Sequence, residues 1–337
     1  MSRVQLGCVL SAVILAFPLA SCSTPDAVSR FCGSASITLT SSSLVFDDMK
    51  ASCLREIDSR IEFGAFKPPV QSDPNCTAIG DQAAGAVAAA RILSDYFRAI
   101  NSLASFGTAK TGTDAQTLLS QTGAAVGASS EAQTALGSIA KFLVSAATSG
   151  YQRRQLEKDL PAVSQNVSSV VSALVTIIKN DYIDRQLASE EQKLADRYRE
   201  FAKGQSSEVK LLLDNRWYSD EQALAAKRAS AQSLITALQA LSRGFSDLAT
   251  NAKKLTGKDL PDLLGPYVTQ LQTLIPRIQK GFWFMHPGGS QWHPRQHPFL
   301  LIRPLQLDNW PISSTVCLKL SMTSGSRIMF RPYRPIS

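Results

Sequence analysis

Residues 159–178 read DLPAVSQNVSSVVSALVTII, and their apolar side chains recur at alternating steps of three and four. That spacing places a stripe on one face of an α-helix, as in helices that pack side by side. The stripe runs through Leu160, Val163, Val167, Val170, Leu174 and Ile177. We expect Asp159 to cap this helix and Pro161 to lie in its first turn, where a missing N–H does no harm.

Similar stripes lie on both sides of this stretch. They predict helices over residues 79–106 and from Glu131 onward, and a continuation of the helix that begins at residue 159 to Phe201. A further helix is expected to begin at a capping box of Ser219 and Gln222 and to carry its stripe to Leu255. The sequence therefore predicts an all-α fold, an elongated antiparallel bundle of about four or five helices over residues 79–280.

A short internal repeat, which we call the sequence echo, lies inside this region. The sequence KDLP at 158–161 recurs at 258–261, and later apolar positions keep the same separation, as Leu174 and Leu274 do. The echo fits a duplicated helical hairpin. It fits equally well a common way of starting a helix, since the identities are few. Both interpretations predict antiparallel helices.

The first 21 residues have the layout of a secretory signal, with Arg3 followed by an apolar run over residues 9–20. That run is shorter than the roughly 20 apolar residues of a transmembrane helix. It ends in LASC at 19–22, and this sequence resembles the lipobox of bacterial lipoprotein precursors. The alternative is an ordinary secreted protein whose apolar run happens to end near a cysteine.

The resemblance implies that residues 1–21 are a signal peptide removed by cleavage before Cys22. It further implies that Cys22 carries a diacylated thiol and an acylated amino terminus, so that lipid anchors the chain to a membrane of the bacterial envelope. Several acyl chains give stable anchoring. Ser23 in place of Asp implies sorting to the outer membrane, with the mature chain facing the periplasm.

Residues 22–78 are expected to be a tether or neck, because residues 23–45 are rich in Ser and Thr. Residues 34–45 would also fit a short strand. An exported chain meets an oxidising compartment, so we expect one disulfide among Cys32, Cys53 and Cys76, and we favour Cys53 with Cys76. Their spacing matches no zinc signature.

The net charge of +8 is concentrated at the two ends of the chain. Residues 281–337 hold six basic residues and one acid, whereas residues 22–280 hold 28 basic and 26 acidic residues. A nearly neutral body gives no reason to expect a nucleic-acid partner. Residues 281–337 also hold all three His and seven of the 16 Pro without any helical pattern, which suggests an irregular, aberrant tail from a frame-shifted gene end. The alternative is a genuine extension that contacts an anionic surface.

The sequence contains no constellation typical of catalysis. All three histidines lie beyond residue 280, so the helical body has no Ser-His-Asp arrangement. Pro294 and Pro298 argue against a helix that would bring His293 and His297 to one metal ion. No P-loop, glycine-rich dinucleotide fingerprint or His-Glu-x-x-His sequence is present. We therefore expect no catalytic residue, no cofactor site, no metal site and no enzymatic activity.

The carboxylates at Asp181, Asp184, Glu190 and Glu191 are expected on a solvated face. The resulting functional hypothesis is a non-catalytic, membrane-anchored envelope lipoprotein that acts as a helical scaffold or binds a protein partner through a helix face. The oligomeric state stays open. The alternative is a membrane-active helical protein that inserts the Gly/Ala-rich segment over residues 113–150.

Overall fold

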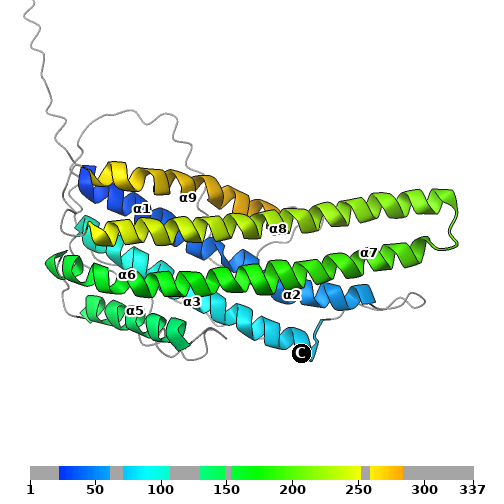
Figure 1. Cartoon of the computed structure of the whole chain (residues 1–337), viewed down its shortest axis with the longest axis horizontal. Coiled ribbons are helices and arrows are strands. Elements are labelled where there is room, and N and C mark those ends of the chain that lie inside the picture. The colour runs from blue at the N-terminus through cyan, green and yellow to red at the C-terminus, as the bar shows by residue number, and fades with distance from the viewer. Residues whose placement is uncertain (1–22, 61–70, 107–129, 149–152, 252–258, 284–337) are drawn as a thin grey trace, which may run out of the picture. The chain divides into compact units, whose positions relative to one another are not determined.

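The computed structural model describes residues 23–60, 71–106, 130–148, 153–251 and 259–283. Over these ranges the chain is helical apart from short turns. The elements in chain order are α1 (Ser23–Ser41), α2 (Ser43–Arg60), α3 (Pro74–Phe106), α5 (Ser130–Thr148), α6 (Arg153–Thr176), the π-helix η1 (Ile177–Leu187), α7 (Ala188–Ala202), α8 (Ser207–Thr250) and α9 (Leu260–Trp283). The helices pack side by side, so the predicted all-α bundle is confirmed (Figure 1).

The core of the bundle is built by apolar residues from α1, α2, α3, α5, α6, η1, α8 and α9. At its centre five aromatic rings meet edge to face, with neighbouring centroids between 5.2 and 6.1 Å apart. Such contacts add to the stabilisation that apolar burial provides. The five rings belong to Phe31, Tyr96, Phe97, Phe142 and Phe245.

The stripe of residues 159–178 lies on a long rod formed by α6, η1 and α7. Leu160, Val167 and Leu174 are buried, as the spacing predicts. The expected cap at Asp159 is wrong, because α6 begins at Arg153 and Pro161 lies inside the helix. The expected continuation to Phe201 is right in extent, but residues 177–187 are wound as a π-helix.

The π winding follows the spacing of the side chains that this stretch buries. Tyr182 and Leu187 are five residues apart, as are Ile178 and Ile183, and all four are buried. A π-helix closes i to i+5 hydrogen bonds, so its wider turn keeps residues at this spacing on one face. The segment therefore continues the buried face of α6 into α7.

Residues 23–60 are not a tether, and residues 34–45 are not a strand. They form α1 and α2, whose apolar residues Phe31, Leu39, Phe46 and Met49 are fully or almost fully buried. The hydroxyl groups of this Ser/Thr-rich stretch find partners inside the bundle. Thr38 donates to the carbonyl of Ser34 at 3.0 Å, so its side chain packs without an unpaired donor. The predicted start of the bundle at residue 79 is therefore wrong.

The expected capping box at Ser219 and Gln222 is also wrong, because α8 begins twelve residues earlier at Ser207. Ser206 is its N-cap, and the Ser206 hydroxyl accepts a hydrogen bond from the backbone N–H of Val209. The extra turns make α8 a helix of 44 residues, about 66 Å long at 1.5 Å per residue.

The helical domain continues past the predicted boundary at residue 280. Gly281 is buried, and its N–H donates to the Ser230 hydroxyl of α8 at 3.0 Å. A side chain at position 281 would overlap the Ala226 carbonyl, so glycine allows α8 and α9 to approach closely. Residues 284–337 lie outside the described residues, and the interpretation of that tail stays a prediction.

The two hairpins suggested by the sequence echo are present as α5 with α6 and α8 with α9. Equivalent positions are buried in both, as Leu160 and Leu260 or Ile178 and Ile278 show. This shared burial is what a duplicated hairpin requires.

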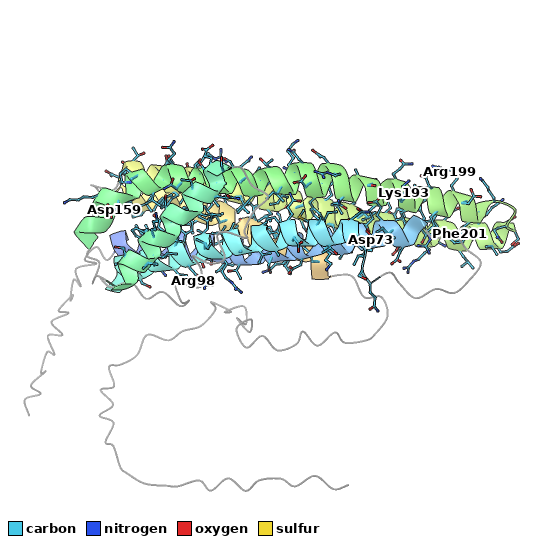
Figure 2. The ribbon with its side chains drawn as sticks, turned by 90° about the horizontal axis from the view of Figure 1, so that it is seen from below. Asp73, Arg98, Asp159, Lys193, Arg199 and Phe201 are labelled. Atoms are coloured by element: carbon cyan, nitrogen blue, oxygen red, sulfur yellow. A yellow bond between two sulfur atoms is a disulfide. The ribbon has the colours of Figure 1, made fainter. Side chains whose placement is uncertain are left out.

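The paired ends of α7 and α8 project beyond the neighbouring helices at one end of the bundle (Figure 1). Lys193, Arg199 and Phe201 lie toward that end, whereas Arg98 and Asp159 lie toward the other (Figure 2). Ser23, the first residue of α1, lies at the end opposite the α7–α8 turn, where α8 ends and α9 begins (Figure 1).

Candidate functional site

Four charged side chains from three helices and one tyrosine from η1 form a largely buried cluster. Asp48 and Arg55 come from α2, Tyr182 from η1, Glu190 from α7 and Lys227 from α8. The side chain of Lys227 is 1% exposed and that of Glu190 is 8% exposed. Because lysine and glutamate are almost never buried without partners, the contacts of this charge cluster decide its role.

Asp48 is the hub of the charge cluster. Its Oδ1 accepts hydrogen bonds from Lys227 Nζ at 3.0 Å and from Arg55 at 3.1 Å. Its Oδ2 accepts from Arg55 at 2.9 Å and from the Tyr182 hydroxyl at 2.7 Å. Both carboxylate oxygens are therefore fully used by three neighbouring side chains.

Glu190 is satisfied in a similar way. Its Oε1 accepts from Arg55 Nε at 2.5 Å, and its Oε2 accepts from the Ser52 hydroxyl at 2.5 Å and from Arg55 at 3.1 Å. Arg55 thus bridges two carboxylates with its planar fork of donors, a geometry that lysine could not provide. The expectation that Glu190 lies on a solvated face is wrong, since this residue is 6% exposed.

Burial and neighbouring charges shift the pKa values of the ionisable groups in the cluster, and not all in the same direction. Burial lowers the pKa of Arg55, but its hydrogen bond to Glu190 and the charge of Asp48 outweigh that effect and hold the pKa above its usual value. Burial lowers the pKa of Lys227, and the charge of Asp48 opposes that shift. Burial, reinforced by the charge of Asp48, raises the pKa of Tyr182 well above its usual value. Tyr182 is therefore a neutral donor at neutral pH.

The charge cluster has the properties of a structural joint. Two acids face two bases, so the ionised cluster is neutral, and the oxygens of both acids are engaged by protein donors. Such a group, when every member is satisfied, fixes the register of the elements that it joins. Tyr182 and Lys227 lie 134 and 179 residues from Asp48 in the sequence, so the cluster ties α2 to η1 and to α8. Within the described residues no group of three or more His, Cys, Asp or Glu is placed to hold a metal ion.

Two of the three cysteines predicted for a disulfide are joined. Cys53 of α2 and Cys76 of α3 form it, as the favoured pairing predicts. Cys32 is free and buried in the core, and burial raises the pKa of its thiol, which keeps it unreactive. Cys22 lies outside the described residues, so its lipidation stays a prediction.

A second candidate site is the exposed face of the projecting part of α8. Large apolar side chains on this part are between 38 and 69% exposed. They are Val209, Leu211, Leu212, Trp217 and Tyr218. Scattered exposed apolar residues are ordinary, but five within ten residues are a high local density. They are distributed around the helix: Leu211 and Tyr218 share one face, and Trp217 lines the groove toward α7. We call residues 209–218 the apolar patch. The patch is not predicted from the sequence, because the capping box places the start of this helix at Ser219, whereas α8 begins at Ser207.

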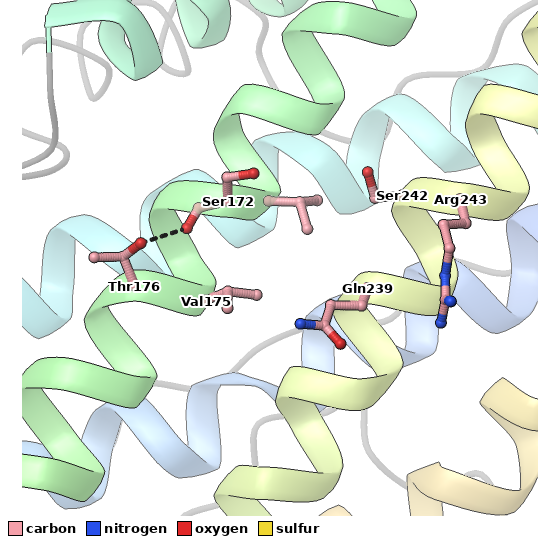
Figure 3. Close-up of a pocket in the computed structure, with 7 residues that line it drawn as sticks. Ser172, Val175, Thr176, Gln239, Ser242 and Arg243 are labelled. Atoms are coloured by element: carbon pink, nitrogen blue, oxygen red, sulfur yellow. Dashed lines mark hydrogen bonds between the residues drawn. The ribbon is translucent and has the colours of Figure 1, made fainter.

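Two grooves border α8. One, of about 230 Å³, lies between α7 and α8 and is lined by residues that include Trp217 and Leu224. The other, of about 450 Å³, lies between α6 and α8. In the second groove Ser172, Val175 and Thr176 face Gln239, Ser242 and Arg243 across the gap (Figure 3). The Thr176 hydroxyl donates to the carbonyl of Ser172, so it is already engaged within α6.

One stretch of the described helices, Lys158–Ala202, is long and apolar enough by length and composition to cross a membrane. Its most apolar window is 39% buried inside the bundle. Val167 and Leu174 lie in the core, and buried core helices share this composition.

Comparison with protein-family models, curated proteins and solved structures finds nothing that matches this chain.

Proposed function

We propose that this chain is a non-catalytic lipoprotein of the bacterial envelope, anchored through Cys22, that binds a protein partner with the projecting part of α8. In this proposal lipid holds the chain to the outer membrane, and the helical bundle extends into the periplasm. The bundle serves as a rigid scaffold that holds the binding helix in place.

The exposed apolar patch over residues 209–218 is the observation that carries the proposal. Leu211 is 63% exposed, Leu212 69% and Tyr218 60%. Tyrosine, with its large amphipathic surface, is enriched at protein interfaces. The patch lies on a regular helix, and a rigid element loses little conformational entropy when it binds.

The charge cluster supports the scaffold part of the proposal. It engages Asp48, Arg55, Glu190 and Lys227 in mutual contacts, so none of these four groups is left as an activated acid or base. The cluster links α2 and η1 to α7 and α8, the two helices whose ends project from the bundle. It therefore holds α8 in one orientation relative to the body of the bundle.

The proposal is tested by placing a photocrosslinking amino acid at Leu212 in the full-length chain, expressed with its own leader in a Gram-negative bacterium. We expect one defined protein adduct on illumination. The matched control is the same amino acid at Thr250, an exposed position at the other end of α8. An absence of adducts at residue 212, or equal adducts at both positions, would count against partner binding by this surface.

Insertion of residues 113–150 into a membrane is the alternative. Residues 113–129 of that segment lie outside the described residues. In α5 the apolar residues Leu136, Ile139 and Leu143 are fully buried in the core. Insertion would require α5 to leave the bundle and expose that stripe, so the packed arrangement favours partner binding over insertion.

A further inference from the structure

The outer face of α8 carries an uncharged stripe that runs from the apolar patch toward the middle of the helix. We call it the α8 seam. It steps along the helix by four and three residues alternately, which is the spacing of a coiled-coil interface. The seam consists of Leu211, Asn215, Tyr218, Gln222, Ala225 and Ala229, and all six are exposed.

The charged residues of α8 avoid the seam. Six charged side chains lie between Leu211 and Ala229, and none occupies a seam position. Four of them bond within the chain: Asp220 to Tyr198 and Arg216, Lys227 to Asp48, and Arg228 to Glu191. A solvent-facing helix face normally carries charge, and its depletion marks the centre of an interface.

From this pattern we infer that the α8 seam pairs in parallel with the seam of a second copy of this chain. The inference rests on the proposed function and names the partner of the same surface. Cyclic two-fold dimers are the commonest assemblies of identical chains. The paired seam would extend from Leu211 to Ala229, about 28 Å at the rise of an α-helix.

Asn215 is well placed for the pairing of two identical seams. In a parallel pair each residue meets its own counterpart, so Asn215 faces Asn215 of the second copy and the two amides hydrogen-bond to each other. A single buried Asn of this kind specifies a dimer and fixes its register. Leu211 and Tyr218 then supply apolar contacts on both sides of the amide pair.

The residues on the two sides of the seam, which we call its flanks, also allow the seams of two copies to pair. On one side lie Asp214 and Glu221, and on the other lie the small residues Ser219 and Ala226. In a parallel pair each acid faces a small uncharged residue of the second copy, so no like charges meet. The small side chains on that flank also let the two helices approach closely.

The position of the chain termini favours the parallel over the antiparallel orientation. Ser23 lies at the end of the bundle opposite the projecting hairpin (Figure 1). With both copies anchored through the residue before Ser23, a parallel pair places both anchors in one membrane. An antiparallel pair would direct them to opposite sides.

The neighbouring helices leave the seam accessible. α9 reaches the flank that holds Ala226 only in its last turn, where Gly281 lies against Ser230 and the backbone carbonyl of Ala226, and the helix ends at Trp283, before the level of the apolar patch. α7 faces α8 across a groove lined on the α8 side by Trp217, Glu221 and Leu224, none of which is a seam position. The first three seam residues therefore face away from both neighbours.

The test uses the full-length chain with its leader, in which Cys317 is replaced by Ser and Tyr218 by Cys. Oxidation with copper phenanthroline in intact cells is expected to give a disulfide-linked homodimer. The matched control is Lys210→Cys, which is exposed on the same helix but off the seam and is expected to give none. A cross-link that forms only between Leu212→Cys and Tyr218→Cys chains would overturn the parallel pairing.

Sedimentation of the full chain in detergent gives the second readout. We expect a dimer for the wild type and for Lys210→Glu, and a monomer for Tyr218→Glu with unchanged thermal unfolding. A wild-type monomer would overturn self-pairing. If photocrosslinking at Leu212 then still yields a defined adduct with another protein, the proposed partner binding stands and only the identity of the partner is wrong. If both experiments fail, the proposed function fails as well.

Discussion

Asp48 collects hydrogen bonds from Arg55, Tyr182 and Lys227, so the loss of any one donor leaves a buried carboxylate less satisfied. Lys227 is the most deeply buried of the three, with 1% of its side chain exposed. It also occupies a core position on α8, between Leu224 and Ala231 on the same stripe. A lysine inside an apolar stripe is the one sequence signal that could have revealed the charge cluster.

Lys227→Met keeps the length of the side chain but removes its charge. We expect it to lower the free energy of unfolding by about 3 kcal/mol, because removing one partner leaves the cluster with an uncompensated negative charge. The measurement is urea denaturation of the full chain. Lys210→Met, at an exposed position of α8, should change the stability by less than about 0.5 kcal/mol. A loss no larger than that of the control would show that the cluster contributes little to stability.

Tyr182 makes stability sensitive to alkaline pH. Its pKa in the folded state is raised above the usual value of about 10, so the unfolded chain releases this proton first. The contribution of Tyr182 is therefore complete below about pH 10, and above that pH it falls by about 1.4 kcal/mol per pH unit. The lowered pKa of Lys227 acts in the opposite sense: stability rises with pH over the range in which the folded protein has released this proton and the unfolded chain still holds it.

The effect of Tyr182 is isolated by comparing the wild type with Tyr182→Phe between pH 8 and pH 11. Below about pH 10 we expect the wild type to be more stable by about 2 kcal/mol, the value of a hydrogen bond to a charged group. That advantage should shrink as pH rises further. Tyr218→Phe, at an exposed position, should follow the wild-type profile. A constant difference across the range would show that Tyr182 does not titrate in this way.

At the scale of whole elements, apolar periodicity located α3, α5 and the α6 to α7 rod, and the sequence echo located α9, because their core positions are filled by apolar residues. It failed for α1, whose buried positions include Ser34, Ser36 and Thr38. The Thr38 hydroxyl donates to the carbonyl of Ser34 one turn back, and the Ser36 hydroxyl bonds to that of Ser94 on α3, so both side chains pack as small residues despite their polarity. The charge cluster could not be assembled from sequence, because its members are distant in the chain and only the fold brings them together.

Close packing of α8 against its neighbours depends on Gly244. A Cβ at this position would lie 2.6 Å from the ring of Phe31 on α1 and 2.9 Å from that of Tyr267 on α9. We expect Gly244→Ala to destabilise the protein by about 2 kcal/mol, since overpacking forces both rings to move. The matched control is Gly265→Ala on α9, where no atom lies within 4 Å, and we expect it to stabilise by about 1 kcal/mol.

Thermal unfolding of both glycine variants separates packing from helix propensity. Both substitutions gain the same propensity for the helix, so a difference in sign between them measures the steric cost at Gly244. Equal shifts in the unfolding temperature would mean that α1 and α9 can move apart without cost.

For the whole molecule, the start of α1, which follows the proposed anchor in the sequence, and the proposed binding surface lie at opposite ends of the bundle (Figure 1). Thr250 lies at the end of the bundle that holds Ser23, and α8 spans about 66 Å from there to the projecting turn.

Energy transfer to a membrane tests this arrangement. The lipidated chain is placed in vesicles of phosphatidylethanolamine and phosphatidylglycerol that carry an acceptor dye on the headgroups. In a Cys317→Ser background, a donor dye at Thr250→Cys should transfer energy strongly to the membrane, and one at Gln205→Cys should transfer little. The same variants with Cys22→Ser should stay off the vesicles and show no transfer at either position. Equal transfer from both positions in the lipidated chain would instead mean that α8 lies along the membrane surface, where its seam could not pair in the way inferred above.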